Sequence, residues 1–95
     1  MAYQIVVKKR FINTSVKLLS YLEKEWGEKT AKSFLKKLDA HIEALQSHPY
    51  AGSPVKSKPE IRGLSITKHN RLFYRIEKNK IVILNLYDTR KKNYK

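Results

Sequence analysis

The first half of the chain contains two segments in which apolar residues recur at helical spacing. Before them, the run YQIVVK at residues 3–8 is rich in β-forming residues and predicts a short strand. The helical spacing then continues up to a glycine, Gly27, which predicts a helix over residues 11–27 with its capping residue among residues 13–15. The apolar positions of this helix are Phe11, Ile12, Val16, Leu19, Leu22 and Trp26.

A second helix is predicted from Glu28 to about Ser47, because its apolar residues form one continuous stripe with charged residues beside it. The two helices meet at Gly27, so we expect an antiparallel hairpin whose shared apolar stripe packs on a sheet. The stripe consists of Ala31, Phe34, Leu35, Leu38, Ile42 and Leu45, and the charged positions beside it are Lys32, Lys36, Lys37, Asp39 and Glu43.

The second half of the chain changes to the pattern of strands. The segment HPYAGSPVKSKPE contains all three prolines and predicts a loop. After it, IRGLSIT, RLFYRIE and KIVILNLYD are separated by short polar turns and predict a meander of three antiparallel strands. We therefore expect one α+β domain over residues 1–95, with an N-terminal strand, the helical hairpin, and the three-stranded antiparallel meander in a sheet that has helices on one face.

Alternation along the middle strand of the meander separates an apolar face from a charged one. Because only two helices are predicted, we expect the face away from them to be partly open. The last strand is apolar on both faces as far as Asn85, which is typical of a central strand. We predict that Leu72, Tyr74 and Ile76 face the helices, and that Arg71, Phe73, Arg75 and Glu77 lie on the open face, joined by Arg62 from the preceding strand.

Charge is unevenly distributed along the chain, whose formal net charge is +13. Residues 1–10 hold three basic and no acidic side chains, residues 11–48 hold six basic and five acidic, and residues 49–95 hold twelve basic and three acidic. The excess in the strand half favours a basic functional surface that binds an acidic partner, such as nucleic acid or an acidic protein. The alternative is a solvated, lysine-rich surface that has no partner.

The sequence lacks the residues that several kinds of chemistry require. The sequence has no cysteine, which excludes disulfides, thiolate metal sites and thiol nucleophiles and suits a reducing compartment. The histidines at 41, 48 and 69 lack the spacing of metal ligands, so we expect no metal and no cofactor. We see no signal peptide and no segment that could span a membrane, so we expect a cytoplasmic protein.

Four stretches of the sequence, taken in order, indicate more than the fold class. They are YLEKEWGEKTAKSFLKKLDAHIEAL in the hairpin, HPYAGSP in the loop, IRGLSITKHNRLFYRI in the strand pair and ILNLYDTRKK at the end. In this order the chain resembles the RelE/ParE superfamily of toxins from bacterial type II toxin-antitoxin systems, of the plasmid stabilisation type. The resemblance implies a toxin that arrests growth and a cognate acidic antitoxin that neutralises it.

The resemblance also implies two alternative targets. ParE-like members poison DNA gyrase, whereas RelE-like members cut mRNA on the ribosome with two lysines, two arginines and a near-terminal tyrosine. Aligned on RLFYRI, Arg71 takes the position of the first arginine and Arg90 lies near that of the second, while Tyr94 lies earlier than the pattern expects for the tyrosine. These three residues would be catalytic only in a RelE-like toxin. The strand positions that would carry the lysines hold Arg62 and Leu64. We therefore favour gyrase over the ribosome with mRNA as the target.

A nuclease also needs a proton acceptor, and arginine is a poor one because it stays protonated. Lys68 or His69, in a predicted turn, could take that role. A third hypothesis is a non-toxic, small basic nucleic-acid-binding domain, which would bind many sequences in a salt-dependent way. The residues that we predict to bind the target or the antitoxin are Arg62, Lys68, His69, Arg71, Phe73, Arg75, Arg90, Lys91 and Lys92.

Overall fold

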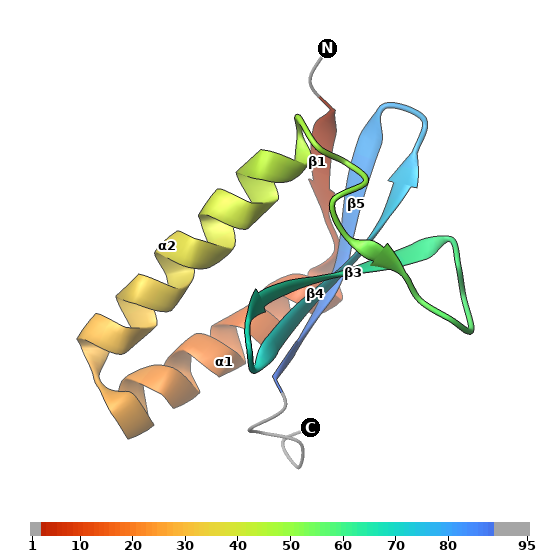
Figure 1. Cartoon of the computed structure of the whole chain (residues 1–95). Helices are drawn as coiled ribbons and strands as arrows, with labels where there is room; N and C mark the ends of the chain where they lie inside the picture. Colours follow the sequence, from red (N-terminus) through yellow and green to blue (C-terminus); the bar gives the residue numbers. More distant parts are fainter. Residues whose placement is uncertain (1–2, 89–95) are drawn as a thin grey trace.

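The structure of the chain is a computed structural model that describes residues 3–88. These residues form two helices and a five-stranded sheet, and both helices lie on the same side of the sheet (Figure 1). The elements are, in chain order, β1 (Gln4–Val7), α1 (Lys9–Trp26), α2 (Glu28–Leu45), β2 (Ser53–Pro54), β3 (Ile61–Thr67), β4 (Asn70–Glu77) and β5 (Lys80–Asp88).

The sheet is mixed and has the strand order β1-β5-β4-β3-β2. Strand β1 pairs in parallel with β5, and the remaining neighbours are antiparallel. The predicted α+β fold, with its N-terminal strand, helical hairpin and antiparallel meander, is confirmed. Strand β5 lies between β1 and β4, which explains why it is apolar on both faces: Ile81, Val82 and Ile83 are at most 3% exposed.

The prediction of a loop throughout HPYAGSPVKSKPE is wrong in one part, since Ser53–Pro54 form β2 and pair with Gly63 and Arg62 of β3. Just beyond β2, the Val55 N–H donates to the Ile61 carbonyl oxygen at 2.8 Å. A proline fits this outermost strand because an edge residue can lack an N–H without breaking a ladder. The prolines made the whole segment read as a loop, but Ser53–Pro54 form a strand because β3 provides an edge with which they can pair.

Helix α1 starts earlier than predicted and buries a different row of residues. It begins at Lys9 after Lys8, whose side chain makes no capping hydrogen bond, so the cap predicted among residues 13–15 is wrong. The buried row is Phe11, Ser15, Leu18 and Leu22, whereas Ile12, Val16 and Trp26 are 48%, 58% and 60% exposed. The predicted stripe thus combined two parallel rows, of which only one packs on the sheet.

The hydrophobic core lies between the helical hairpin and the sheet. Helix α2 buries most of its predicted stripe, but Leu35 is exposed and Ile42 is half-buried. On the sheet side, Leu72 and Tyr74 face the helices as predicted. The side chains that are no more than 2% exposed in this core are Leu18, Leu22, Leu38, Leu45, Leu72, Tyr74, Ile81, Ile83 and Leu86.

Candidate functional site

The face of the sheet that the helices leave uncovered carries three of the predicted site residues. Arg71, Phe73 and Arg75 alternate along β4 with the fully buried Leu72 and Tyr74, so they lie on the opposite face, as predicted. Their neighbours across the strands are Ser65, Gly63 and Ile61 on β3, and Tyr87, Asn85 and Val82 on β5. We call Arg71, Phe73, Arg75 and Tyr87 the basic sheet face.

Arg71 lies across the backbone of a glycine on the neighbouring strand. A β-carbon at Gly63 would come within 2.6 Å of the Arg71 Nε and 2.7 Å of its Nη2. The Arg71 Cζ is also 6.0 Å from the centre of the Phe73 ring, within range of a cation–π interaction. The missing side chain at Gly63 therefore gives this exposed guanidinium a place against the sheet, from which its donors can bind an anion in bidentate fashion.

A shallow depression next to Arg71 gathers four of the predicted site residues, Lys68, His69, Arg71 and Phe73. They come from the β3–β4 turn and from β4 itself. Sequence reasoning did not include Tyr87, which is 45% exposed and pairs with Arg71 across β4 and β5. The alternation of β5 could have placed it there once the register was known. The other residues that line the depression are Ser65, Thr67 and Asn70.

A buried polar network holds the turn that carries Lys68 and His69. The Asn70 Nδ2 donates to the Asp88 Oδ2 at 2.8 Å, and the two residues are 2% and 0% exposed. The Thr67 hydroxyl donates to the Asn70 Oδ1 at 2.6 Å and accepts from the His69 N–H at 3.1 Å. Buried polar networks that are hydrogen-bonded in this way rigidify the backbone around them. Sequence reasoning missed the network because it depends on the pairing of Asn70 with Asp88.

Arg75 lies on the same face but does not line the depression. Its Nε donates to the Glu77 carboxylate, and both side chains are partly exposed. An ion pair at such a solvated position contributes little to stability, but it reduces the charge that Arg75 offers to a partner. Arg71 is consequently the arginine of the basic sheet face whose position best suits an incoming anion.

The expectation that Arg62 joins this face is wrong. Arg62 pairs with Tyr74 across β3 and β4, so its side chain lies on the side of the helices. Its Nη1 donates to the Gly52 carbonyl oxygen at 2.6 Å, and its guanidinium lies 4.7 Å from the centre of the Tyr50 ring. The alternation of β3 puts Gly63, not Arg62, beside Phe73. Through these contacts with Gly52 and Tyr50, Arg62 holds the loop after α2 against the sheet.

The remaining predicted site residues, Arg90, Lys91, Lys92 and Tyr94, lie outside the described residues. Within residues 3–88, no cluster of three or more histidine, aspartate or glutamate side chains could hold a metal ion. Over the same residues, neither helix combines the length and the apolar character that crossing a bilayer requires.

A family model described as the ParE toxin of the type II toxin-antitoxin system parDE matches residues 5–93 of the chain. The chain belongs to this ParE toxin family. No curated protein matches the sequence significantly. Membership favours a toxin over the non-toxic nucleic-acid-binding domain, and it agrees with the RelE/ParE resemblance.

Solved structures of related folds agree with the architecture of this ParE toxin. A chain of the chromosomal ParDE system from P. aeruginosa is similar, with a TM-score of 0.78 and 16% identity over 92% of this chain and 96% of that one. The E. coli DinJ-YafQ toxin-antitoxin complex gives a TM-score of 0.68 and 14% identity over 99% and 100% of the two chains. The RelBE2 toxin-antitoxin complex from Mycobacterium tuberculosis gives 0.59 and 18% over 93% and 99%. At these identities the similarity concerns the fold alone.

The positions that a RelE-like nuclease would fill with lysines have a common location in this ParE toxin. Arg62 and Leu64 pair with Tyr74 and Leu72, so both lie on the side of the helices. Arg71 lies on the other side of the sheet. Arg62 and Leu64 therefore lie on the opposite face of the sheet from Arg71.

Proposed function

We propose that this ParE toxin arrests growth by binding DNA gyrase, and that it does not cut mRNA. One observation carries the choice: Arg62 and Leu64 occupy the lysine positions of the nuclease pattern and face the helices, away from Arg71. In-line cleavage of RNA needs a proton acceptor and cations at one phosphate. Residues on opposite faces of a sheet cannot act on the same phosphate.

The basic sheet face is the surface that we propose to contact the target. Arg71 offers a forked donor that suits a carboxylate or phosphate, and Phe73 and Tyr87 offer aromatic area beside it. Arginine and aromatic side chains are the residues that most often dominate binding energy in protein interfaces. The geometry thus fits binding to an acidic protein surface without a catalytic step.

The charge of the strand half supports neutralisation by an acidic antitoxin. Residues 49–95 hold twelve basic and three acidic side chains, a field that attracts an acidic, disordered segment and lets it fold on contact. The DinJ-YafQ and RelBE2 structures are toxin-antitoxin complexes of related folds. We propose that the partner of this chain is its own cognate antitoxin.

The test measures two activities of the purified toxin in parallel, DNA supercoiling by gyrase and cleavage of ribosome-bound mRNA. We expect the wild-type protein to inhibit supercoiling and to leave mRNA intact, and Arg71→Ala to lose most of this inhibition while its melting temperature stays within a few degrees of wild type. Lys37→Ala, an exposed change on α2, serves as the matched control. Cleavage of mRNA by the wild type, abolished by Arg71→Ala, would replace our proposal with the nuclease.

One observation favours that second candidate, an mRNA endoribonuclease. Lys68, His69 and Arg71 line one depression, and Tyr87 borders it. Cationic and imidazole groups around one hollow can bind a phosphate and move a proton. In the same cleavage assay, a nuclease that uses this depression would lose activity in His69→Ala or Lys68→Ala, whereas the gyrase activity would not require a proton acceptor.

A further inference from the structure

The turn between β3 and β4 lacks the residues that usually stabilise so short a connection. Strand β3 ends at Thr67 and β4 begins at Asn70, so only two residues join the strands. Two-residue hairpin turns favour glycine, asparagine or aspartate, because they need positive φ angles. Within residues 3–88, Lys78 is the one residue other than glycine that has a positive φ, so the turn at residues 68–69 does not have that geometry. Its conformation therefore depends on contacts from outside the turn.

Three side chains supply these contacts, and we call Thr67, Asn70 and Asp88 the turn network. The Asn70 amide donates to Asp88 on β5 and accepts from the Thr67 hydroxyl on β3. The Thr67 hydroxyl also accepts from the His69 N–H. The network thus connects three neighbouring strands to the backbone of the turn.

The turn network lies one ladder position away from Arg71. Asn70 pairs with Asp88, and the next pair along the two strands is Arg71 with Tyr87. Alternation buries Asn70 and Asp88, which are 2% and 0% exposed, and leaves Arg71 and Tyr87 at the surface. Asn70 and Asp88 are therefore shielded from a protein partner, but they fix the two strands that carry Arg71 and Tyr87.

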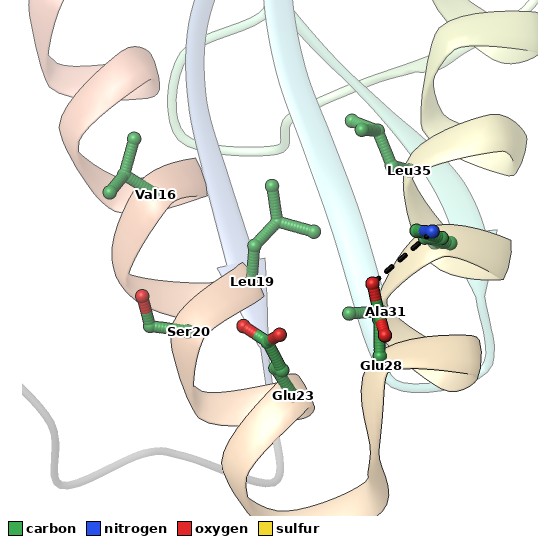
Figure 2. A pocket seen from close by; sticks show the side chains of 8 residues that line it. Val16, Leu19, Ser20, Glu23, Glu28, Ala31 and Leu35 are labelled. Atoms are coloured by element: carbon green, nitrogen blue, oxygen red, sulfur yellow. Dashed lines mark ion pairs between the residues drawn. The ribbon is translucent and has the colours of Figure 1, made fainter.

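The hollow between the two helices differs in character from the depression beside the turn (Figure 2). Its lining includes the apolar Leu19 and Leu35, and the lysine that lines it, Lys32, pairs with Glu28 at 3.2 Å. The depression beside Arg71 is bordered by basic side chains from the turn and from β4. An acidic surface therefore fits this depression better than the hollow between the helices.

Stability alone gives a weak reason for burying the polar groups of the turn network. The hydrogen bonds between a buried carboxyl group and a buried amide mainly offset their loss of water, and apolar side chains of similar size often stabilise as well or better. Buried polar groups that break such a rule are expected where function requires one particular geometry. Asn70 and Thr67 border the depression that gathers four of the predicted site residues, so the network lies where such a geometry would matter.

We propose that Thr67, Asn70 and Asp88 are positioning residues of the target site, which hold the turn so that Lys68 and Arg71 meet an acidic surface in one fixed arrangement. This inference rests on the proposed function of the basic sheet face. Preorganised groups bind more tightly because less conformational entropy is lost on binding. Loss of the network therefore weakens binding without removing any basic group.

The experiment compares Asn70→Ala with the exchange variant Asn70→Asp with Asp88→Asn in the full-length toxin. The exchange keeps the net charge, a donor at position 88 and an acceptor at position 70, so the bonds among the three side chains can form again. We expect Asn70→Ala to need about tenfold more protein for half-inhibition of gyrase supercoiling. The exchange variant should recover most of this loss, and growth arrest on induction should follow the same order.

Two further measurements separate positioning from folding. All variants are assayed at a temperature at which circular dichroism shows them folded, and the matched control is Tyr74→Phe, which also removes two hydrogen bonds of a buried side chain. Amide hydrogen exchange at His69 should become about tenfold faster in Asn70→Ala but not in Tyr74→Phe. The salt dependence of gyrase binding should stay at the wild-type value in Asn70→Ala and decrease in Lys68→Gln, because only the latter loses a charge.

The outcomes separate this inference from the proposed function. If the wild type inhibits gyrase and folded Asn70→Ala inhibits it equally well, the network has no positioning role, although the proposed function stands. An equal loss of inhibition in Tyr74→Phe would reduce the effect to stability and would also overturn the inference. If Asn70→Ala does not fold, Thr67→Val makes the same comparison, with Thr67→Ser, which keeps the hydroxyl, as the variant that should retain activity.

Growth arrest decides the inference if the target is not gyrase. A wild type that arrests growth without inhibiting supercoiling would overturn the proposed target, and the same variants would then be compared by growth arrest and by hydrogen exchange at His69. Weaker arrest in Asn70→Ala that the exchange variant restores supports the positioning role. A wild type with neither activity would overturn both the proposed function and the inference.

Discussion

The absence of a side chain at Gly63 and at Gly52 lets other groups lie close to the backbone at these two positions. A β-carbon at Gly63 would meet the Arg71 guanidinium on the basic sheet face. A β-carbon at Gly52 would come within 2.8 Å of both the Tyr74 hydroxyl and the Gly63 carbonyl oxygen. One glycine therefore positions an exposed arginine, and the other lets the loop after α2 close over a buried tyrosine.

Gly63→Ala should reduce growth arrest without unfolding the toxin. The added methyl group displaces the flexible Arg71 side chain, which can swing into solvent, so we expect the unfolding free energy to change by no more than about 1 kcal/mol. The measurements are chemical denaturation and growth on induction, compared with Ser65→Ala on the same face. Full toxicity of Gly63→Ala together with loss of toxicity in Arg71→Ala would show that the resting position of Arg71 is unimportant.

Tyr74→Phe should destabilise the loop after α2. The Tyr74 hydroxyl donates to the Pro49 carbonyl oxygen at 2.8 Å and accepts from the Gly52 N–H at 2.9 Å. Removing it leaves a buried N–H unpaired, so we expect a loss of about 1–3 kcal/mol in the free energy of unfolding. Tyr21→Phe, at a half-buried tyrosine on α1, gives a comparison at another position.

The same tyrosine predicts a dependence on alkaline pH. Burial raises the pKa of Tyr74 above its ordinary value of 10.0, against the lowering effects of the Gly52 hydrogen bond and of Arg62. The neutral phenol thus contributes stability that is fully present below the pKa of the unfolded chain and is lost as the pH rises through the folded pKa. The stability difference between wild type and Tyr74→Phe should be constant well below pH 10.0 and should shrink as the pH rises above that value. A constant difference would contradict the assignment.

At the scale of the elements, the helical hairpin uses its two faces differently. The inner face of α2, with Phe34, Leu38 and Leu45, packs on the sheet and is almost fully buried. The outer face, with Leu35, Lys36 and Lys37, is exposed. Helical periodicity brings buried and exposed residues next to each other in sequence, so neighbouring substitutions should have opposite consequences.

Leu38→Asp should prevent folding, whereas Lys37→Asp should change the unfolding free energy by about 0.5 kcal/mol or less. Leu38 is 2% exposed in the core, where an unpaired carboxylate costs several kcal/mol, and Lys37 lies in solvent. Circular dichroism and thermal melting distinguish the two variants. Equal melting temperatures would mean that the faces of α2 are wrongly assigned.

At the scale of the whole molecule, charge is unevenly divided between the two halves of the sequence. Residues 49–95 carry an excess of +9 out of the net charge of +13, whereas residues 11–48 carry an excess of +1. Electrostatic fields act over about a Debye length, roughly 10 Å at 0.1 M salt, whereas apolar side chains stabilise a complex only once they are in contact. The charge of the strand half therefore attracts a partner before apolar contacts can form.

Association with the antitoxin should consequently slow as ionic strength rises. We expect the association rate constant to fall by about tenfold or more between about 0.05 M and about 0.5 M salt, because screening weakens the field of the strand half. Stopped-flow or surface binding kinetics give this rate. Lys78→Gln with Lys80→Gln, two exposed lysines in the β4–β5 turn region, should reduce the salt dependence. A rate that is indifferent to salt would contradict electrostatic recruitment.

The sequence by itself determined the order of the main elements, because helical spacing, β-forming runs and a glycine between the helices are local properties of the chain. It also placed Arg71, Phe73 and Arg75 on one face, since alternation within a strand needs no partner. It brought Lys68 and His69 to the adjoining turn. The RelE/ParE resemblance then supplied the family, which the family model confirms.

Only the tertiary structure decided which rows and faces have neighbours. The packing of α1 on the sheet buries Phe11, Leu18 and Leu22 and leaves Val16 exposed. The buried row and the exposed row both have helical spacing. The tertiary structure moved Arg62 to the side of the helices, because the register of β3 against β4 sets the face of each residue. It also created β2 and the pairing of Asn70 with Asp88. Each of these depends on contacts between segments that are distant in sequence, which no local pattern specifies.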